Sequence, residues 1–220
     1  MSGSNDVHFR VTPGGQLSGR LRVPGDKSIS HRAIMLGSLA EGRTDVSGFL
    51  EGEDSLATLS AFRAMGVQID GPHDGRVLIE GVGLHGLQQP DGHLYLGNSG
   101  TSMRLMSGLL AGQAFSTTLT GDVSLSGRPM KRVTAPLTSM GANIDATAEG
   151  TAPLLIHGGA MLEGIQYHMP VASAQVKSSL LLAGLYATGQ TCVTEPAPTR
   201  DHTERMLSGM GYPLQRDGAR

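Results

Sequence analysis

The stretches AFRAMGVQID (61–70), PLTSMGANID (136–145) and MLSGMGYPLQ (206–215) each carry a Met-Gly pair at the end of a helical apolar pattern. Their Met-Gly glycines lie 75 and 70 residues apart. Glycine is typical of the position just after a helix C-terminus, where the backbone turns with a positive φ. Each stretch therefore predicts a helix end followed by a strand.

A second set of landmarks recurs upstream in the same order, in LAEGRTDVSGF (39–49), LAGQAFSTTLTG (110–121) and YATGQTCVTEP (186–196). The glycine after the leading apolar residues recurs at spacings of 70 and 77, and a β-branched stretch follows it each time. Each again predicts a helix end followed by a strand. The apolar residues with helical spacing before these glycines are Ile29, Ala33, Leu36 and Ala40, then Met103, Met106, Leu109 and Leu110, then Val176, Leu180, Leu181 and Leu185.

Together the landmarks predict an α/β fold of three repeated β-α-β-α-β-β units of about 70 residues. The alternative is an ordinary α/β domain in which helices and strands alternate by coincidence. We expect the units at about 21–92, 93–162 and 163–220. The strand-like segments GRVLIEGVG (75–83) and APLLIHGG (152–159) would close the first two, whereas the third unit stops before such a strand. We therefore expect either a truncated chain or one half of a larger protein.

The composition excludes several classes of protein. With 220 residues, 39% hydrophobic and 16% charged, the chain has the composition of a globular protein. A net charge of -2 and a pI near 6.4 argue against a general nucleic-acid binder. No apolar run approaches the roughly 20 residues that cross a bilayer, and residues 1–19 are unlike a signal peptide. A single cysteine, Cys192, allows no intrachain disulfide, so we expect a cytoplasmic protein.

Small polar loops precede the first helix of each unit: PGDKS (24–28), GNSGTS (97–102) and ASAQVKS (172–178). A helix N-terminus attracts anions through its unpaired N–H groups and its dipole, and the repeat should bring three such ends to one face. Arginine binds phosphate and carboxylate bidentately, so we expect a small ligand that carries both groups. The basic residues in or just after these loops are Lys27, Arg32, Arg104, Arg128, Lys131, Lys177 and Arg200.

Other motifs are weak. Asp26 stands where a P-loop needs glycine, and Pro90 leaves no room for a helix after the GxGxxG-like GVGLHG (81–86), so neither an NTPase nor a dinucleotide cofactor is favoured. No HExxH motif suggests a metal site, and Cys192 in a strand is more often a buried apolar residue than a nucleophile. Taken alone, Ser173 would be a helix cap and Gln175 a first-turn residue.

Five of these segments together resemble the 5-enolpyruvylshikimate-3-phosphate synthase family, over about residues 20–212 and in the order found there. The resemblance implies two globular domains, each of three β-α-β-α-β-β units around a pseudo-threefold axis, with this chain as the amino-terminal half. Residues 1–20 would then be a strand segment that packs on the second domain, and 21–220 the amino-terminal globular domain. The matching segments are PGDKSISHRA (24–33), LGNSGTSMRL (96–105), GRPMKR (127–132), ASAQVKSSLLLAG (172–184) and TRDHTERM (199–206).

What the resemblance implies is transfer of the enolpyruvyl group of phosphoenolpyruvate to the 5-hydroxyl of shikimate 3-phosphate, with release of phosphate. It implies no metal and no organic cofactor. Lys27 would be catalytic and contact both substrates. Shikimate 3-phosphate would be held by Lys27, Ser28, Arg32, Ser173, Ala174, Gln175 and Arg200. Phosphoenolpyruvate would be held by Lys27, Gly100, Thr101, Arg128 and Gln175.

The family's Asp and Glu proton-transfer residues belong to the carboxy-terminal half, so the chain alone is expected to be inactive. Gly100 matches the glyphosate-sensitive members of the family, although GDKSISHR and ASAQVKSS look more like the tolerant class. We give Gly100 more weight, because a missing methyl group cannot clash with the inhibitor.

Two alternatives stay open. UDP-N-acetylglucosamine enolpyruvyl transferase shares the fold, but it has Lys-Asn where this chain has Lys27-Ser28. It also usually carries a reactive cysteine in a loop of the second unit, and residues 121–129 contain none. From a different class, the chain could be a noncatalytic fragment that keeps a phosphate site.

Overall fold

The computed structural model describes residues 7–218. Its first unit consists of α1 (Lys27–Leu39), β1 (Glu41–Val46), α2 (Glu53–Ala64), β2 (Gln68–His73) and β3 (Arg76–Val82). The three strands form an antiparallel sheet in the order β1-β3-β2.

The second unit repeats this arrangement with one more strand. Its sheet has the order β4-β5-β7-β6, in which β4 runs parallel to β5 and the other neighbours are antiparallel. The short helix α4 is an addition that the repeat pattern does not predict. The elements are β4 (Leu94–Tyr95), α3 (Gly100–Ala111), β5 (Thr117–Thr120), α4 (Val123–Ser126), α5 (Lys131–Ser139), β6 (Ile144–Asp145) and β7 (Leu154–Ile156).

The third unit contains β8 (Gln166–His168), α6 (Ala174–Gly184), β9 (Cys192–Thr194) and α7 (His202–Gly209). Strand β8 is parallel to β9, as β4 is to β5. The β-α-β-α-β-β pattern is thus complete in the second unit. The first unit lacks its leading strand among the described residues, and the third, as far as residue 218, lacks its two closing strands.

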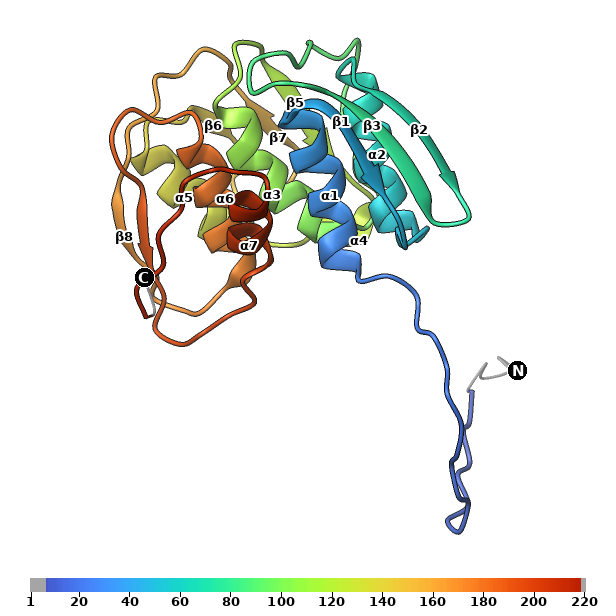
Figure 1. Cartoon of the computed structure of the whole chain (residues 1–220). Coiled ribbons are helices and arrows are strands. Elements are labelled where there is room, and N and C mark those ends of the chain that lie inside the picture. Colours follow the sequence, from blue (N-terminus) through green and yellow to red (C-terminus); the bar gives the residue numbers. More distant parts are fainter. Residues whose placement is uncertain (1–6, 219–220) are drawn as a thin grey trace, which may run out of the picture.

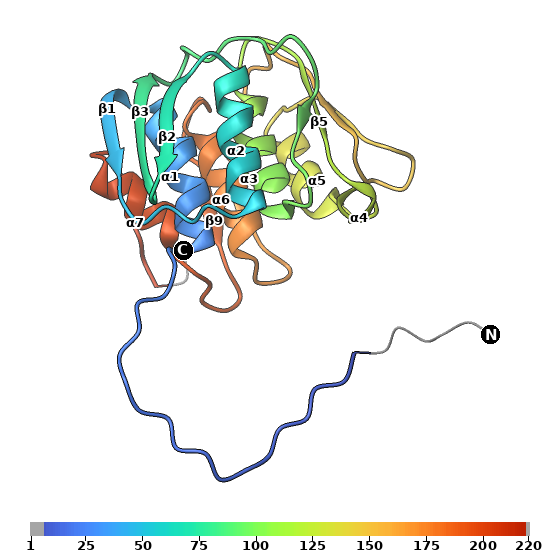
Figure 2. The same cartoon turned by 90° about the vertical axis from the view of Figure 1, so that its right-hand side faces the viewer.

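The helices lie in the middle of the molecule and the sheets lie outside them (Figure 1). Helix α3 packs along α6, while α2 and α7 pack against α1. Residues 7–26 leave the body at the N-terminal end of α1 and run away from it in both views (Figures 1 and 2). None of the helices within residues 7–218 has the length and apolar character needed to cross a membrane.

The repeated Met-Gly pairs end three helices, as predicted. Gly66, Gly141 and Gly211 have φ angles of 87°, 97° and 88°, a region that side-chain-bearing residues rarely adopt. The methionine before the glycine is buried in the first two units, at Met65 and Met140, where it fills the core. In the third unit the equivalent methionine is 44% exposed.

The core consists mainly of Leu, Ile, Val and Met, and the predicted apolar helix faces supply much of it. The first residue of the predicted apolar face of α1 does not join the core: Ile29 is 43% exposed, because the first turn of α1 projects from the body and burial begins at Ser30. From Ser30 to Leu39 every residue of α1 is buried. A helix buried all round fixes the direction of its N-terminal turn firmly.

Candidate active site

The three predicted loop segments each contain a residue that caps a long helix, and the helix begins within the segment. The side chains of Asp26, Ser99 and Ser173 accept hydrogen bonds from the backbone N–H three residues later, at 2.8, 3.2 and 3.4 Å. Each cap satisfies one N–H of its helix start and leaves others free for a ligand. Ser173 therefore does have the capping role that its sequence position alone suggested, and Ala174 is the first residue of α6.

Hydrogen bonds between side chains bring the three helix starts together. The Gln175 amide donates to Thr101 Oγ1 at 3.0 Å and accepts from Arg104 Nη1 at 2.7 Å, which joins α6 to α3. Arg200, in the loop before α7, donates to Ser28 Oγ at 3.2 Å and so joins the third unit to α1. The expected common face of the three helix N-termini is therefore confirmed.

Two arginines close in on the start of α3. A Cβ atom placed on Gly100 would lie 3.0 Å from Arg104 Nη1 and 3.1 Å from Arg128 Nη1. Within residues 7–218, both guanidinium groups hydrogen-bond to neutral oxygens, Arg104 to Gln175 and Arg128 to Asn98, rather than to carboxylates. Two like charges beside a helix N-terminus make a strong site for an anion.

The neighbouring charges also affect Arg104. The pKa of Arg104 is lowered mainly by burial and further by the nearby charges of Arg128 and Arg132. An anionic ligand bound here would relieve this repulsion. Sequence reasoning noted Arg104 as a basic residue without giving it a ligand, although its place one turn after Gly100 on the same helix was the available signal.

Asn98 positions Arg128. Its amide donates to Asp122 Oδ2 at 2.8 Å, and its carbonyl oxygen accepts from Arg128 Nη2. The Asn98 hydrogen bond, together with one from the Leu125 backbone, lowers the pKa of Asp122, which caps α4. Sequence reasoning did not single out Asn98, although it lies inside the GNSGTS loop.

Lys27 opens the first turn of α1 and is half exposed. Its Nζ lies 2.9 Å from Asp54 Oδ2 in α2. No local pattern predicts this pairing, because the two residues are 27 positions apart. Ser28, the next residue, is half-buried and faces Arg200.

Arg32 lies beneath the face rather than on it. It is 4% exposed, and burial lowers its pKa to about 10, with Glu204 opposing the shift. Its three nitrogens donate to Thr203 Oγ1 at 2.6 Å, Ser28 O at 2.8 Å and Ser178 Oγ at 2.7 Å. Arg32 thus ties α1 to α6 and α7, a role that the expected ligand contact did not include.

The expectation that Lys177 contributes to the anion-binding face is wrong. Its side chain is 6% exposed and forms ion pairs with Glu195 at 3.1 Å and Glu204 at 2.6 Å. Glu195 also accepts from the Thr199 hydroxyl at 2.6 Å, next to Arg200. Lys177 therefore stabilises the loop that carries Arg200 from inside the protein.

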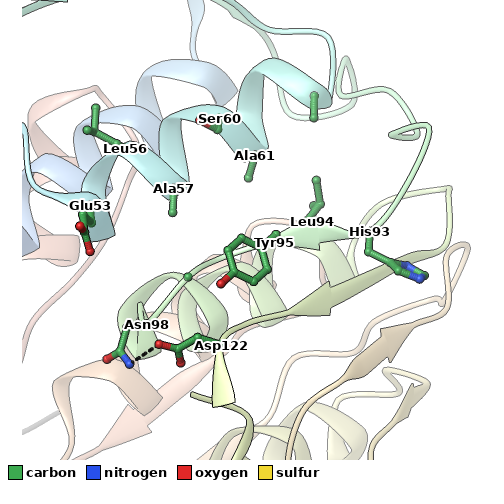
Figure 3. Close-up of a pocket in the computed structure, with 12 residues that line it drawn as sticks. Glu53, Leu56, Ala57, Ser60, Ala61, His93, Leu94, Tyr95, Asn98 and Asp122 are labelled. Carbon is green, nitrogen blue, oxygen red and sulfur yellow. Dashed lines mark hydrogen bonds between the residues drawn. The ribbon is translucent and has the colours of Figure 1, made fainter. Parts of the chain in front are cut away.

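A groove of about 660 Å³ runs beside this face between α2 and β4 (Figure 3). Its walls are apolar along α2, where Leu56, Ala57 and Ala61 face Tyr95 across the gap. Asn98 and Asp122 line its polar end (Figure 3), so Asn98 belongs both to the groove and to the support of Arg128. Within residues 7–218, no group of three His, Cys, Asp or Glu side chains is placed to hold a metal ion.

Solved structures share this architecture. Two structures of EPSP synthase from Acinetobacter baumannii match with a TM-score of 0.89 and 62% sequence identity over 91% of this chain. The chain, with three small sheets around a helical interior, therefore has the enolpyruvyl transferase fold of these structures.

The family model described as EPSP synthase (3-phosphoshikimate 1-carboxyvinyltransferase) matches residues 11–220. Relatives named 3-phosphoshikimate 1-carboxyvinyltransferase from Alkalilimnicola ehrlichii and Methylococcus capsulatus are each 73% identical, over 97% and 98% of this chain. The chain belongs to the EPSP synthase family. It spans about half the length of these relatives, 48% and 49%.

Proposed function

We propose that this chain supplies the amino-terminal half of an enzyme that transfers the enolpyruvyl group of phosphoenolpyruvate to the 5-hydroxyl of shikimate 3-phosphate. The observation that carries the proposal is the group around Gln175, whose amide bridges Thr101 and Arg104 while Arg128 lies next to Arg104 beside Gly100. Two cations that form no ion pair among residues 7–218, beside a helix start, suit an anionic substrate.

Each substrate has a proposed set of contacts. Phosphoenolpyruvate binds at Gly100, Thr101 and Arg128, with Lys27 and Gln175 reaching it from the neighbouring helix starts. To these we add Arg104, because its guanidinium lies beside Gly100. Shikimate 3-phosphate binds at the α1 and α6 starts, through Lys27, Ser28, Ser173, Ala174, Gln175 and Arg200.

Arg32 supports the proposed site mainly from the protein interior, where it is buried beneath the start of α1. Its bond to the Ser28 carbonyl holds the first turn of α1, and its charge adds to the positive potential. Any direct contact with shikimate 3-phosphate would use the N–H groups that its three internal hydrogen bonds leave free.

The chemistry fits these residue types. Protonation of the methylene carbon of phosphoenolpyruvate creates a cationic centre, which the 5-hydroxyl of the acceptor attacks. The hydroxyl proton is then lost, and phosphate leaves together with a proton from the new methyl group, which restores the carbon–carbon double bond of the transferred group. Fixed arginine and lysine side chains hold the phosphate and carboxylate charges throughout, at no cost in reorganisation. The proton-transfer groups belong to the second half, and no metal or organic cofactor takes part.

The proposed domain organisation follows the repeats. Residues 21–220 form the amino-terminal globular domain, with units at about 21–92, 93–162 and 163–220. Residues 1–20 form a strand segment that packs on the second domain, and residues 1–6 lie outside the described part of the chain. The partners of this chain are therefore its two substrates and the carboxy-terminal half.

Two alternative functions differ from the proposed one, the first in its acceptor substrate and the second in its lack of turnover. A UDP-N-acetylglucosamine enolpyruvyl transferase usually carries a reactive cysteine in a loop of the second unit, whereas the single cysteine of this chain, Cys192, lies in β9 of the third unit. A noncatalytic fragment would bind shikimate 3-phosphate and gain no activity from a carboxy-terminal half.

Calorimetry with shikimate 3-phosphate tests the proposal. We expect the chain to bind this ligand without turnover, and to gain turnover when the carboxy-terminal half is supplied, because closure of both halves completes the site and excludes water. Turnover by the 220-residue chain alone, or no gain with the second half, would contradict it.

Matched variants test the site. Lys27→Met should abolish binding, whereas Lys131→Met, an exposed change at the start of α5, should cost much less. Arg200→Ala should weaken binding roughly 10- to 100-fold, as expected for loss of a charged hydrogen bond, while Arg205→Ala on the exposed side of α7 should leave it unchanged. Unchanged affinity in both Lys27→Met and Arg200→Ala would refute the assignment.

A further inference from the structure

A chain of buried polar side chains crosses three helices behind the proposed site. His31 Nδ1 in α1 lies 2.7 Å from Thr58 Oγ1 in α2, and Thr58 Oγ1 lies 2.6 Å from Ser102 Oγ in α3. The Ser102 hydroxyl donates to Ser99 Oγ at 2.6 Å. All four side chains are fully buried.

The direction of the hydrogen bonds along this chain of side chains, which we call the relay, follows from the bond between Ser102 and Ser99. The Ser102 hydrogen is given to Ser99, and the Thr58 hydroxyl lies 2.6 Å from Ser102 Oγ but 3.4 Å from its other acceptor, the Asp54 carbonyl, so we assign the hydrogen between Thr58 and Ser102 to Thr58. Thr58 can then only accept from His31, so His31 carries its hydrogen on Nδ1. His31 Nε2 has no hydrogen-bond partner among the described residues, which suits a bare lone pair better than an N–H.

The imidazole stays neutral under ordinary conditions. Burial lowers the pKa of His31 to about 4, and the charges of Lys27 and Arg32 act in the same direction while Asp54 opposes them. A neutral ring has one N–H and one bare nitrogen, as the relay requires.

The relay connects the two proposed substrate sites. At one end, His31 lies one turn after Lys27 and Ser28 on α1. At the other end, Ser99 caps α3 immediately before Gly100 and Thr101. The α1 side has a second, independent attachment, because Arg32 binds α1 to Ser178 in α6 and Thr203 in α7. Among the hydrogen bonds of the described residues, those that link α1 to α3 run through this relay.

We propose that His31, Thr58 and Ser102 form a positioning relay that sets the distance between the shikimate 3-phosphate and phosphoenolpyruvate sites, an inference that rests on the proposed function. Breaking it leaves the first site intact, because Arg32 still holds α1 against α6 and α7. It shifts the α3 start, so the second ligand binds poorly to a protein that already holds the first.

The relay can be broken with little change of shape. Thr58→Val removes the hydroxyl and keeps the branched side chain, whereas Thr58→Ser keeps the hydroxyl. Ser38→Ala is the matched control, since Ser38 is equally buried on α1 and its Oγ has no hydrogen-bond partner among the described residues. Circular dichroism and thermal melts check that each variant is folded at the assay temperature.

Steady-state kinetics are measured on the complete enzyme, this chain with its second half. Thr58→Val should raise the KM for phosphoenolpyruvate about 5- to 20-fold and change the affinity for shikimate 3-phosphate less than about twofold. Thr58→Ser should restore most of the loss, and Ser38→Ala should resemble the parent. A merely structural residue would lower the active fraction, and hence kcat, with both KM values unchanged, and that outcome would overturn the proposal.

The tautomer of His31 is tested separately on the histidine-labelled 220-residue chain. Long-range ¹H–¹⁵N correlation spectra should show His31 protonated on Nδ1 at pH 7, and protonation on Nε2 would overturn the relay. This measurement needs neither substrate nor turnover. If the complete enzyme acted on neither proposed substrate, the proposed function would fail while the spectra still decided the relay.

Discussion

Gly100 is buried at the start of α3, and two guanidinium groups close the space beside it. A methyl group there would press on Arg104 and Arg128 by a few tenths of an ångström. Both contacts involve the ends of flexible side chains, so the fold should tolerate Gly100→Ala with a change in stability of about 1 kcal/mol or less. The added methyl group should instead displace the guanidinium groups of Arg104 and Arg128, which are the proposed anion-binding groups.

We expect a complete enzyme with this half to be inhibited by glyphosate, competitively with phosphoenolpyruvate. Gly100→Ala should raise the inhibition constant more than the KM for phosphoenolpyruvate, because the added methyl crowds the longer inhibitor more than the shorter substrate. Inhibition assays on parent and variant measure both constants. A parent that is already tolerant, or a variant that is equally sensitive, would mean that other loop residues set the size of this pocket.

His31 makes the stability of the chain depend on pH. Its pKa is about 4 when folded and 6.5 ordinarily, so between these values the unfolded chain binds more protons than the folded chain. Stability therefore rises with pH across this window and is lost as pH falls from 6.5 towards 4. Urea unfolding should give a free energy about 2 kcal/mol lower at pH 5 than at pH 7. In His31→Asn this difference should shrink; an equal difference would assign it to other groups.

Sequence reasoning at the residue scale succeeded where a motif fixes both position and direction. Ser173 was recognised as a helix cap, and Asp26 and Ser99, which were not named as caps, occupy the equivalent position one residue before a helix start. Sequence reasoning did not foresee the burial of Arg32 and Lys177, because burial depends on partners far along the chain. Arg32 meets residues 146 and 171 positions away, and no local pattern reports that distance.

At the scale of elements, α6 and α7 are joined by one buried cation. Lys177 in α6 holds Glu204 in α7 and Glu195 after β9. Burial acts to raise the pKa of Glu195, but hydrogen bonds from Thr199 and Lys177 outweigh it, so the pKa is lowered and the carboxylate stays charged. The cation is therefore needed to balance buried charge.

Lys177→Met should destabilise the chain by about 3–5 kcal/mol, because it leaves two buried carboxylates without their partner. Lys131→Met, at the exposed start of α5, should change stability by about 0.5 kcal/mol or less. Urea unfolding at pH 7 compares the two variants. Equal stability of parent and Lys177→Met would show that the ion pairs contribute nothing net.

Helix ends were the best predicted feature at this scale, since Gly66, Gly141 and Gly211 all adopt the positive φ that their position requires. The short helix α4 and the groove beside β4 were not predicted. Helix α4 is one turn long and leaves no periodic pattern, and the groove arises between two units, where no single segment carries a signal.

At the scale of the whole molecule, the repeat explains why a site exists at all. Each unit brings one long helix to the same face with its N-terminus outward, and side-chain bonds from Gln175 and Arg200 hold the three ends together. The sequence reveals the units and their loops through spacing. It does not reveal which basic side chains turn inward, because that depends on how the units pack.

The segment before α1 packs least against the rest of the described chain. Residues 7–26 form no helix or strand, and Val7, Phe9 and Val11 are 76%, 90% and 89% exposed. Alternate apolar residues in an extended chain are typical of a strand that packs on another surface, which we propose to be the second domain.

Hydrogen exchange tests this segment. Within the described residues, the backbone N–H groups of 7–11 form no hydrogen bond with another backbone group, so in the isolated chain they should exchange at close to the rate of an unfolded peptide. In the complete enzyme they should be protected, because pairing with the second domain would bury them. The paired strands β1 and β3 provide the control, since Thr44 and Ile79 should be protected in both proteins. Strong protection across Val7 to Val11 in the isolated chain would mean that the segment has a partner within these 220 residues.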